Sequence, residues 1–289
     1  MKAVNILVVN PPREYRENID GEYVDIAMEK AENLANELSR SINLIHEHLV
    51  LLLVGEQKQS FAFGRALAIK AENIHELIKE VMLMLSVTEN PNLNFALGLL
   101  SGVYQKSADD WSCYLKIFSE NPKLMVFYHE VILTGLIEQY QLNTLLNIIK
   151  NGQLSALSAI NLKYGGVIKH LRESDISSFC LDLAKVDAGG HWVALDIMFM
   201  YCYGDDNKFY ATKDALRILV TSVPLNAKFR GGHSDMYYWK EIISKISKTE
   251  GLDFAKEVCQ QIIAATDDKL DYGDIWVLSN TKHKHYFFN

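Results

Sequence analysis

Apolar residues recur every three or four positions along most of this 289-residue chain. That spacing places an apolar stripe along one face of a helix, so the pattern predicts amphipathic α-helices. The first stripe runs from Tyr23 to Leu52. It predicts either one helix of about 30 residues or two helices separated near residues 39–41. Further helices are predicted over residues 56–70 and 73–87.

From about residue 76 the chain repeats one plan, in which a short helix A, a turn and a more apolar helix B follow one another. The predicted A helices begin 31 to 39 residues apart, a period typical of two-helix repeats. The B segments, such as residues 124–137 and 192–203, are apolar on most sides and therefore need cover on most sides. The predicted first residues of the A helices are Glu76, Asp110, Gln141, Ile176, Lys213 and Leu252.

Short sequence matches support this register. Glu89-Asn90-Pro91 returns as Glu120-Asn121-Pro122, where each proline is predicted to end helix A and to begin helix B. Gly189-Gly190-His191 returns as Gly231-Gly232-His233. If these turns are equivalent, His191 and His233 lie roughly 10 Å apart on one edge. Further matched pairs are Ala156-Leu157 with Ala194-Leu195, Gly152 with Gly190, and Gly166 with Gly204.

The period and pattern of residues 70–280 resemble the α-solenoid class of HEAT-like and tetratricopeptide-like arrays, although the tetratricopeptide signature residues are absent. The resemblance implies an all-α fold of about six antiparallel helix pairs, preceded by an N-terminal helical segment, and a binding scaffold. The chain is also similar to the C-terminal helical repeats of large bacterial signal-sensing ATPases, including antiviral ones. That likeness implies the recognition region of a larger defence or signalling assembly.

Three regions are predicted: an N-terminal segment or linker over residues 1–22, N-terminal helices over 23–75 and the helical-repeat array over 76–289. Residues 11–22 are polar and proline-containing, which predicts a loop. Residues 1–10 predict a short strand or the end of an element that belongs to something upstream. We expect no signal peptide, because Pro11 and Pro12 follow without a small-residue cleavage pattern.

Composition favours a globular helical protein, with 49% hydrophobic and 22% charged residues and only 16 glycines and 5 prolines. The net charge of −7 disfavours nucleic acid as the main partner, because phosphate binding requires clustered Lys and Arg. The apolar run of residues 49–54 is too short to cross a membrane. Four scattered cysteines predict reduced core thiols in a cytoplasmic protein: Cys113, Cys180, Cys202 and Cys259.

No motif for catalysis is present, neither a glycine-rich phosphate loop nor a serine-hydrolase elbow, so we assign no catalytic residue and no cofactor. On a helix, His46 and His48 point to opposite sides, which argues against a shared metal ion. An extended His283-Lys284-His285 tail could bind a metal ion, but the following Tyr286-Phe287-Phe288 favours a tail that docks on an apolar surface, with a cut-short chain end as the alternative. The pairs Asp109-Asp110 and Asp205-Asp206 are interpreted as helix caps.

Residues 226–240 form the longest predicted A-to-B connection and combine basic with aromatic side chains. Because aromatic and Arg side chains concentrate binding energy in interfaces, this segment is a candidate partner-binding loop. Alternatively, its aromatics form the buried face of helix B and its glycines form a turn. The candidate residues are Lys228, Arg230, His233, Tyr237, Tyr238 and Trp239, together with His191 on the neighbouring turn.

The sequence thus predicts a non-catalytic, cytoplasmic scaffold or adaptor that binds a protein partner, and it leaves homo-oligomerisation open. One alternative is an enzyme or small-ligand-binding protein with a polar pocket in an α/α core. A further alternative is a helical-repeat nucleic-acid-binding protein, against which the acidic charge balance counts.

Overall fold

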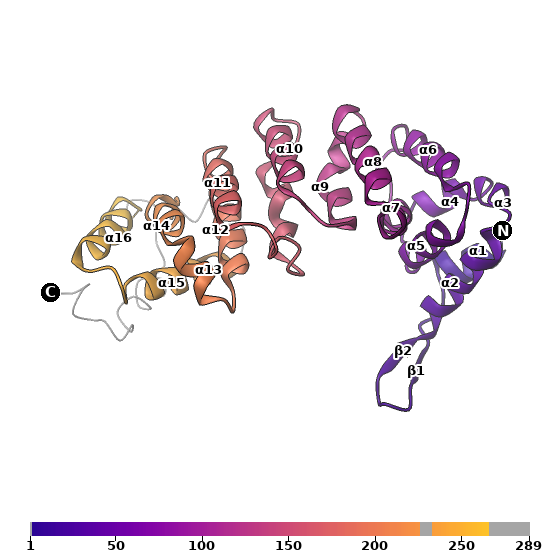
Figure 1. Ribbon diagram of the computed structural model, residues 1–289, viewed down its shortest axis with the longest axis horizontal. Helices are drawn as coiled ribbons and strands as arrows, with labels where there is room; N and C mark the ends of the chain where they lie inside the picture. Colours follow the sequence, from indigo (N-terminus) through magenta and orange to yellow (C-terminus); the bar gives the residue numbers. More distant parts are fainter. Residues whose placement is uncertain (1, 226–232, 266–289) are drawn as a thin grey trace. The chain divides into compact units, whose positions relative to one another are not determined.

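The computed structural model describes residues 2–225 and 233–265, which are helical apart from one hairpin of two short strands (Figure 1). The predicted all-α class is confirmed. The chain divides into two compact units, residues 1–136 (unit 1) and residues 137–289 (unit 2). Within the described ranges, no helix has both the length and the hydropathy that a membrane span requires.

Unit 1 has its core where helix α7 lies between α5 and α8. Phe63 of α5 stacks on Phe95 of α7 with ring centroids 5.9 Å apart. Trp111 of α8 packs edge-on against Tyr104 at 5.2 Å and donates its indole hydrogen bond to Thr134. The elements of unit 1 are α1 (Lys2–Val4), the π-helical turn η1 (Asn5–Val9), β1 (Tyr15–Glu17), β2 (Tyr23–Asp25), α2 (Ile26–Leu38), α3 (Asn43–His46), α4 (Leu49–Leu53), α5 (Ser60–Lys70), α6 (Ile74–Leu85), α7 (Asn94–Lys106), α8 (Ala108–Glu120), the 3-10 turn η2 (Met125–Phe127), α9 (Tyr128–Val131) and the 3-10 turn η3 (Ile132–Thr134).

Three glycines allow α5 and α7 to approach until their backbones touch. A Cβ atom added to Gly98 would lie 2.2 Å from the carbonyl oxygen of Phe61. The equivalent atom on Gly64 would lie 2.6 Å from the Phe95 oxygen, and that on Gly102 would lie 2.5 Å from the Arg65 oxygen. Since no side chain fits in this space, glycine is required at the crossing.

The N-terminal expectations need correction. Residues 2–9 are helical, not a strand, and residues 15–25 form an antiparallel hairpin, not a loop. The turn explains the hairpin: the Asn18 side chain accepts hydrogen bonds from the backbone N–H groups of Asp20 and Glu22, and Gly21 adopts a positive φ of 79°. Tyr15, Tyr23 and Val24 favour the extended backbone of the strands, and the turn chemistry joins the two strands.

Unit 2 is built around α12, which contacts α11, α14, α15 and the 3-10 segment η4. Nearly every α12 side chain from His191 to Met198 is buried, in agreement with the all-round apolar pattern. The elements of unit 2 are α10 (Gln139–Lys150), η4 (Ala156–Lys163), α11 (Glu173–Leu183), α12 (Ala188–Cys202), α13 (Asp206–Ala211), α14 (Lys213–Ser222), α15 (His233–Ile246) and α16 (Leu252–Ala265).

The predicted A helices are confirmed as α6, α8, α10, α11, α14 and α16, each beginning within three residues of the predicted start. The first apolar stripe breaks after Leu38, as its two-helix alternative predicted. The predicted B helix over residues 124–137 is wrong. It breaks into the short turns η2, α9 and η3, since its β-branched residues favour helix weakly and Gly135 is extended.

Some sequence matches do not correspond to equivalent structure. Pro91 and Pro122 lie between helices and not at the first helical position. Gly152 has a positive φ of 73°, whereas Gly190 lies inside α12, where a Cβ would meet the Leu183 oxygen at 2.5 Å. Cys113 is exposed and therefore not a core thiol, whereas Cys180 and Cys202 are buried as predicted.

Long-range side-chain hydrogen bonds in both units join residues about one helix pair apart. In unit 1, Lys106 donates to the Ala71 carbonyl, 35 residues away, at 2.9 Å. In unit 2, Trp192 donates to the Pro224 carbonyl, 32 residues away, at 3.0 Å. Gln261 likewise donates to the Val223 carbonyl at a separation of 38 residues. These bonds join residues 32 to 38 positions apart within one unit.

Asp187 caps α12, the central helix of unit 2. Its Oδ1 accepts the Gly190 backbone N–H at 2.6 Å. We expect Asp187→Ala to lower the free energy of unfolding by about 1 kcal/mol, because one N–H at the helix start loses its acceptor. Asp187→Asn keeps the acceptor and should unfold at nearly the wild-type urea concentration. Equal losses in both variants would contradict the capping role.

Candidate functional site

Four aromatic side chains of unit 2 gather where α12 meets α15. Phe199 of α12 stacks on Tyr238 of α15, with ring centroids 4.3 Å apart and planes inclined by 20°. Tyr203 and Tyr237 lie beside Phe199 at centroid distances of 6.0 and 6.3 Å. Tyr203 directly follows the last residue of α12 and has an extended backbone, and its ring lies beside that of Phe199.

Tyr203 and Tyr237 border an open groove of about 260 Å³ on the surface of unit 2. Their side chains are 61% and 56% exposed, whereas Phe199 and Tyr238 are half-buried. We call this feature the aromatic groove. Its lining residues are Phe199, Cys202, Tyr203, Gly204, Phe209, Tyr237, Glu241, Ile242, Ser244, Lys245 and Lys248.

A buried ion pair lies next to the Tyr238 ring of the aromatic cluster. The Lys163 Nζ of η4 lies 2.6 Å from an Asp196 carboxylate oxygen of α12, and their side chains are only 8% and 3% exposed. The same ammonium group lies 5.8 Å from the centre of the Tyr238 ring, within range of a cation–π interaction. Burial by itself would lower the pKa of Lys163, but the hydrogen bond and charge of Asp196 together raise it.

Lysine side chains surround the groove on the α13 and α15 sides. Lys245 forms an ion pair with Asp206 and places its Nζ 4.2 Å from the centre of the Phe209 ring. Lys208 lies at the same distance over the Tyr201 ring. Lys248 lines the groove and is exposed. The groove therefore combines aromatic faces with cationic groups.

The structure brings together two of the seven candidates, Tyr237 and Tyr238. Trp239 is buried and donates from its indole nitrogen to the Val220 carbonyl at 2.9 Å. His191 is also buried, with its Nε2 3.0 Å from the Leu219 carbonyl oxygen, and burial lowers its pKa. Both side chains hold α14 against its neighbours, so we leave them out of the proposed binding surface. The other three candidates, Lys228, Arg230 and the His233 side chain, lie outside the described residues.

Comparison with known proteins gives no match. No family model, curated protein sequence or solved structure is significantly similar to this chain. The site must therefore be judged from its own geometry.

Sequence reasoning missed Phe199, Tyr203, Lys163 and Asp196 as functional candidates. A signal for them was present, because Asp196 is the only charged residue in the otherwise apolar segment 192–203. A lone charge in a buried helix requires a partner of opposite sign. The i, i+4 spacing of Phe199 and Tyr203 was also visible, but it does not indicate which face of a nearly all-apolar helix reaches solvent.

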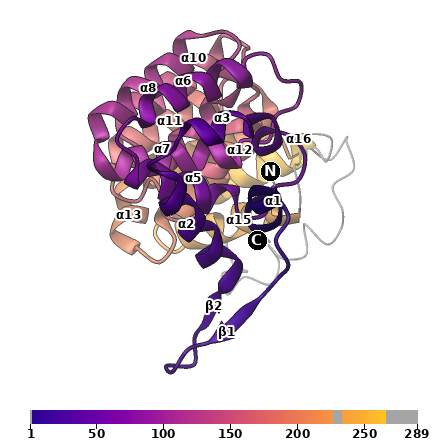
Figure 2. The same ribbon diagram turned by 90° about the vertical axis from the view of Figure 1, so that its right-hand side faces the viewer.

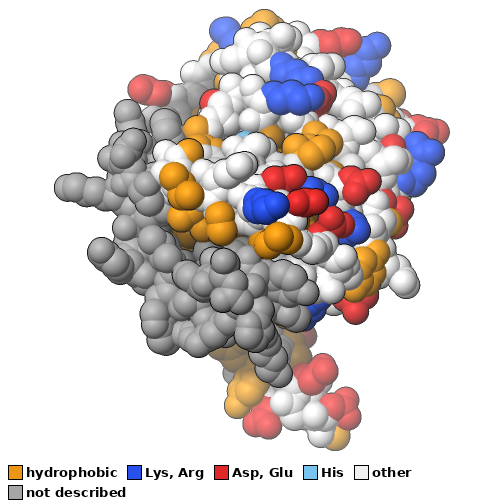
Figure 3. Space-filling model, turned by 90° about the vertical axis from the view of Figure 1, so that its left-hand side faces the viewer, with side chains coloured by type: hydrophobic (Ala, Val, Ile, Leu, Met, Phe, Trp, Pro, Cys, Tyr) orange, Lys and Arg blue, Asp and Glu red, His pale blue; other side chains and the backbone are white. Residues whose placement is uncertain are grey.

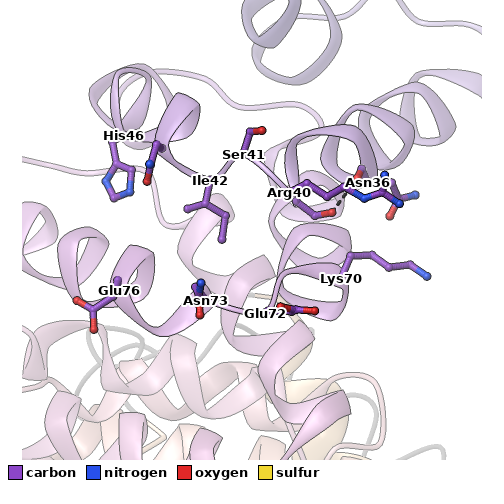
Figure 4. Close-up of a pocket in the computed structure, with 11 residues that line it drawn as sticks. Asn36, Arg40, Ser41, Ile42, His46, Lys70, Glu72, Asn73 and Glu76 are labelled. Carbon is purple, nitrogen blue, oxygen red and sulfur yellow. Dashed lines mark hydrogen bonds between the residues drawn. The ribbon is translucent and has the colours of Figure 1, made fainter.

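Unit 1 contains a second, larger groove, of about 1020 Å³, between the end of α2, α3 and the start of α6 (Figure 4). Arg40 and Lys70 contribute positive charges to it, and Glu72 and Glu76 contribute negative charges. These four side chains are exposed and the groove is open. In general acid–base catalysis, burial separates the pKa values of the acid and the base. The charged groups of this groove are exposed, so their arrangement does not support such catalysis.

The candidate metal and cap residues have ordinary structural roles. His46 forms an ion pair with Glu80 of α6, and the described residues contain no cluster of three or more potential metal ligands. Asp205 caps α13 as predicted. Asp110 is not the cap of α8, because Ser107 accepts the Asp110 backbone N–H at 3.1 Å. The His283–His285 tail lies outside the described residues.

Proposed function

We propose that this chain is a protein-binding module built from stacked helix pairs, and that the aromatic groove of unit 2 is its binding surface. The observation that carries the proposal is the exposure of Tyr203 and Tyr237, whose rings lie on Phe199 and border the groove. Exposed aromatic clusters on rigid helices are typical of protein interfaces, where they provide large contact area at low entropic cost.

The hydrogen bonds between successive helix pairs support the stacking part of this proposal. In unit 2, Lys150 pairs with Asp182, Lys163 with Asp196 and Arg217 with Glu257, at separations of 32, 33 and 40 residues. Repeated bonds at one period are expected when each pair packs on the preceding one, as in an α-solenoid. Such an array presents a rigid surface without requiring a catalytic centre.

The charges at the groove favour a protein partner over nucleic acid. Its lysines are interleaved with acidic groups, since Lys245 pairs with Asp206 and Glu241 also lines the groove. A phosphate backbone requires a continuous basic surface. At the α16 end of unit 2 the acidic and basic side chains are likewise mixed (Figure 3). We further propose a cytoplasmic location, supported by the four unpaired cysteines, and a role as the recognition part of a larger assembly.

The proposal is tested by selecting binders from a displayed peptide library against the full chain and measuring their affinities by calorimetry. The double variant Tyr203→Ala/Tyr237→Ala should weaken the selected peptides by about tenfold or more, since interface tyrosines commonly contribute more than 1 kcal/mol each.

The matched control is Tyr140→Ala, because Tyr140 of α10 is comparably exposed but lies far along the chain from the groove. The proposal is wrong if no peptide is selected, or if the control weakens binding as much as the double variant does. The double variant should retain the wild-type circular dichroism, because both side chains are more than half exposed.

A further inference from the structure

The β1–β2 hairpin of unit 1 projects from the N-terminal end of α2, away from the helices (Figures 1 and 2). Its turn presents Ile19 with a relative exposure of 105%, and Tyr15 and Tyr23 are also exposed. Tyr15 pairs with Asp25 and Tyr23 with Glu17, so both tyrosines lie on one face of the hairpin. A projecting strand pair thus carries three large apolar side chains in full contact with water.

The unit holds this arm in place. Glu14 forms an ion pair with Lys30 of α2, and Arg16 lies 3.6 Å from Glu29. Asp25 ends β2 and caps α2 by accepting the Ala27 and Met28 backbone N–H groups. An isolated two-stranded hairpin is marginally stable in water. The hairpin is anchored at its base, and its apolar tip is exposed. This arrangement is expected of a segment that another surface covers.

The tip is acidic. Glu17, Asp20 and Glu22 lie within six residues of one another and are all exposed. None of the three forms an ion pair with another residue in the part of the chain that the structure describes. The hairpin therefore presents Ile19 among three carboxylates.

The aromatic groove has the complementary character. It is an apolar depression of about 260 Å³, and a cavity of about 150 Å³ is enough to hold benzene. Lys245 and Lys248 line it together with Glu241, Lys245 pairs with Asp206, and Lys208 lies nearby over Tyr201, so three lysines stand against two carboxylates. A single branched side chain surrounded by carboxylates fits this combination in size, polarity and charge.

We propose that the hairpin of one copy of this chain docks into the aromatic groove of a second copy. Ile19 occupies the depression between Tyr203 and Tyr237, and the tip carboxylates face the groove lysines. This inference rests on the proposed function and names the occupant of the same surface. One such contact leaves a free groove on the copy whose hairpin is docked and a free hairpin on the other copy. We propose that further copies add head to tail at these free surfaces, which makes the contact heterologous.

Sedimentation velocity on the full chain over a wide concentration range tests the proposal. We expect a concentration-dependent series of oligomers that shrinks as salt rises, because carboxylate–lysine attraction is screened. Ile19→Asp should weaken the association by about tenfold or more, since it removes the buried side chain and adds a fourth carboxylate. Val87→Asp is the matched control, because Val87 is 69% exposed in unit 1 and should leave assembly unchanged.

A mixing experiment distinguishes a heterologous contact from any symmetric one. The Ile19→Asp variant keeps an intact groove, and the Tyr203→Ala/Tyr237→Ala variant keeps an intact hairpin. Each variant alone should be monomeric, and an equimolar mixture should form dimers that grow no further.

The proposal is overturned if the wild type is monomeric throughout, if Ile19→Asp assembles like the wild type, or if the mixture stays monomeric. In each of these cases the peptide-binding result for the Tyr203→Ala/Tyr237→Ala variant still decides the proposed function. Failure of the self-docking inference is thereby separable from failure of the binding surface.

Discussion

Gly98→Val should unfold unit 1 at a temperature about 10 °C lower than the wild type. A side chain at residue 98 meets the Phe61 backbone, which cannot rotate away as a side chain would. Relief therefore requires α5 and α7 to separate, and this exposes Phe63 and Phe95. Overpacking of a core costs about 1–3 kcal/mol and more when backbone is displaced, which corresponds to a shift of this size.

Hydrogen exchange measured by mass spectrometry is the appropriate readout, because it reports on peptides of unit 1 and unit 2 separately. Protection should fall in α5 and α7 first. Gly251→Ala is the control, since a Cβ at that position has nothing within 4 Å, and it should leave exchange unchanged. Wild-type protection of α5 and α7 in Gly98→Val would show that the helices do not depend on backbone contact.

Lys163→Met should lower the free energy of unfolding by about 3–5 kcal/mol in urea, because it removes the cation to which the buried Asp196 carboxylate is bonded. The double variant Lys163→Met/Asp196→Leu should recover much of that loss, since it removes both buried charges. Lys150→Met provides a matched control. Its ion pair with Asp182 has a similar length but an exposed setting, so its loss should stay below about 1 kcal/mol.

The pH dependence of this effect has a definite sign. The pKa of Lys163 is raised in the folded protein. A raised lysine pKa stabilises the fold below the unfolded value of about 10.4, and the stabilisation is lost as the pH rises through the folded pKa. The difference between wild type and Lys163→Met should therefore be full at pH 7 and shrink in strongly alkaline solution. A difference that grew above pH 10.5 would contradict the ion pair as its source.

The period of apolar segments was enough to predict where the A helices begin, because an amphipathic stripe must be buried whatever its neighbours are. It did not predict the broken segment within residues 124–137. Lys213 and Leu252 begin helices where the pattern placed them. The pattern did not reveal the crossing at Gly98, because close approach depends on which helices are adjacent in space. It also did not reveal the hairpin, because the polar, proline-containing residues 11–22 predicted a loop, whereas the Asn18 side chain organises a turn between two strands.

The candidate site was predictable only in part, because its composition also depends on which helices are adjacent in space. Tyr237, Tyr238 and Trp239 are consecutive, and the sequence gives no indication of which of them a helix turns outward. Packing separates them: Tyr237 borders the groove, Tyr238 is half-buried against Phe199, and Trp239 is in the interior. The buried Lys163–Asp196 pair joins elements 33 residues apart and required the fold to be known.

If the helix pairs stack as we propose, the hydrogen bonds between residues about three dozen positions apart also affect how the chain is made. A residue such as Trp192 or Gln261 finds its partner only about three dozen positions away. Contacts between residues this close in sequence form quickly, because little chain entropy is lost when the intervening segment is closed into a loop. During synthesis each new helix pair of such a stack can pack on the preceding pair as soon as it leaves the ribosome. A premature stop would then yield a shorter stack with one uncovered apolar end, which is a surface that chaperones recognise.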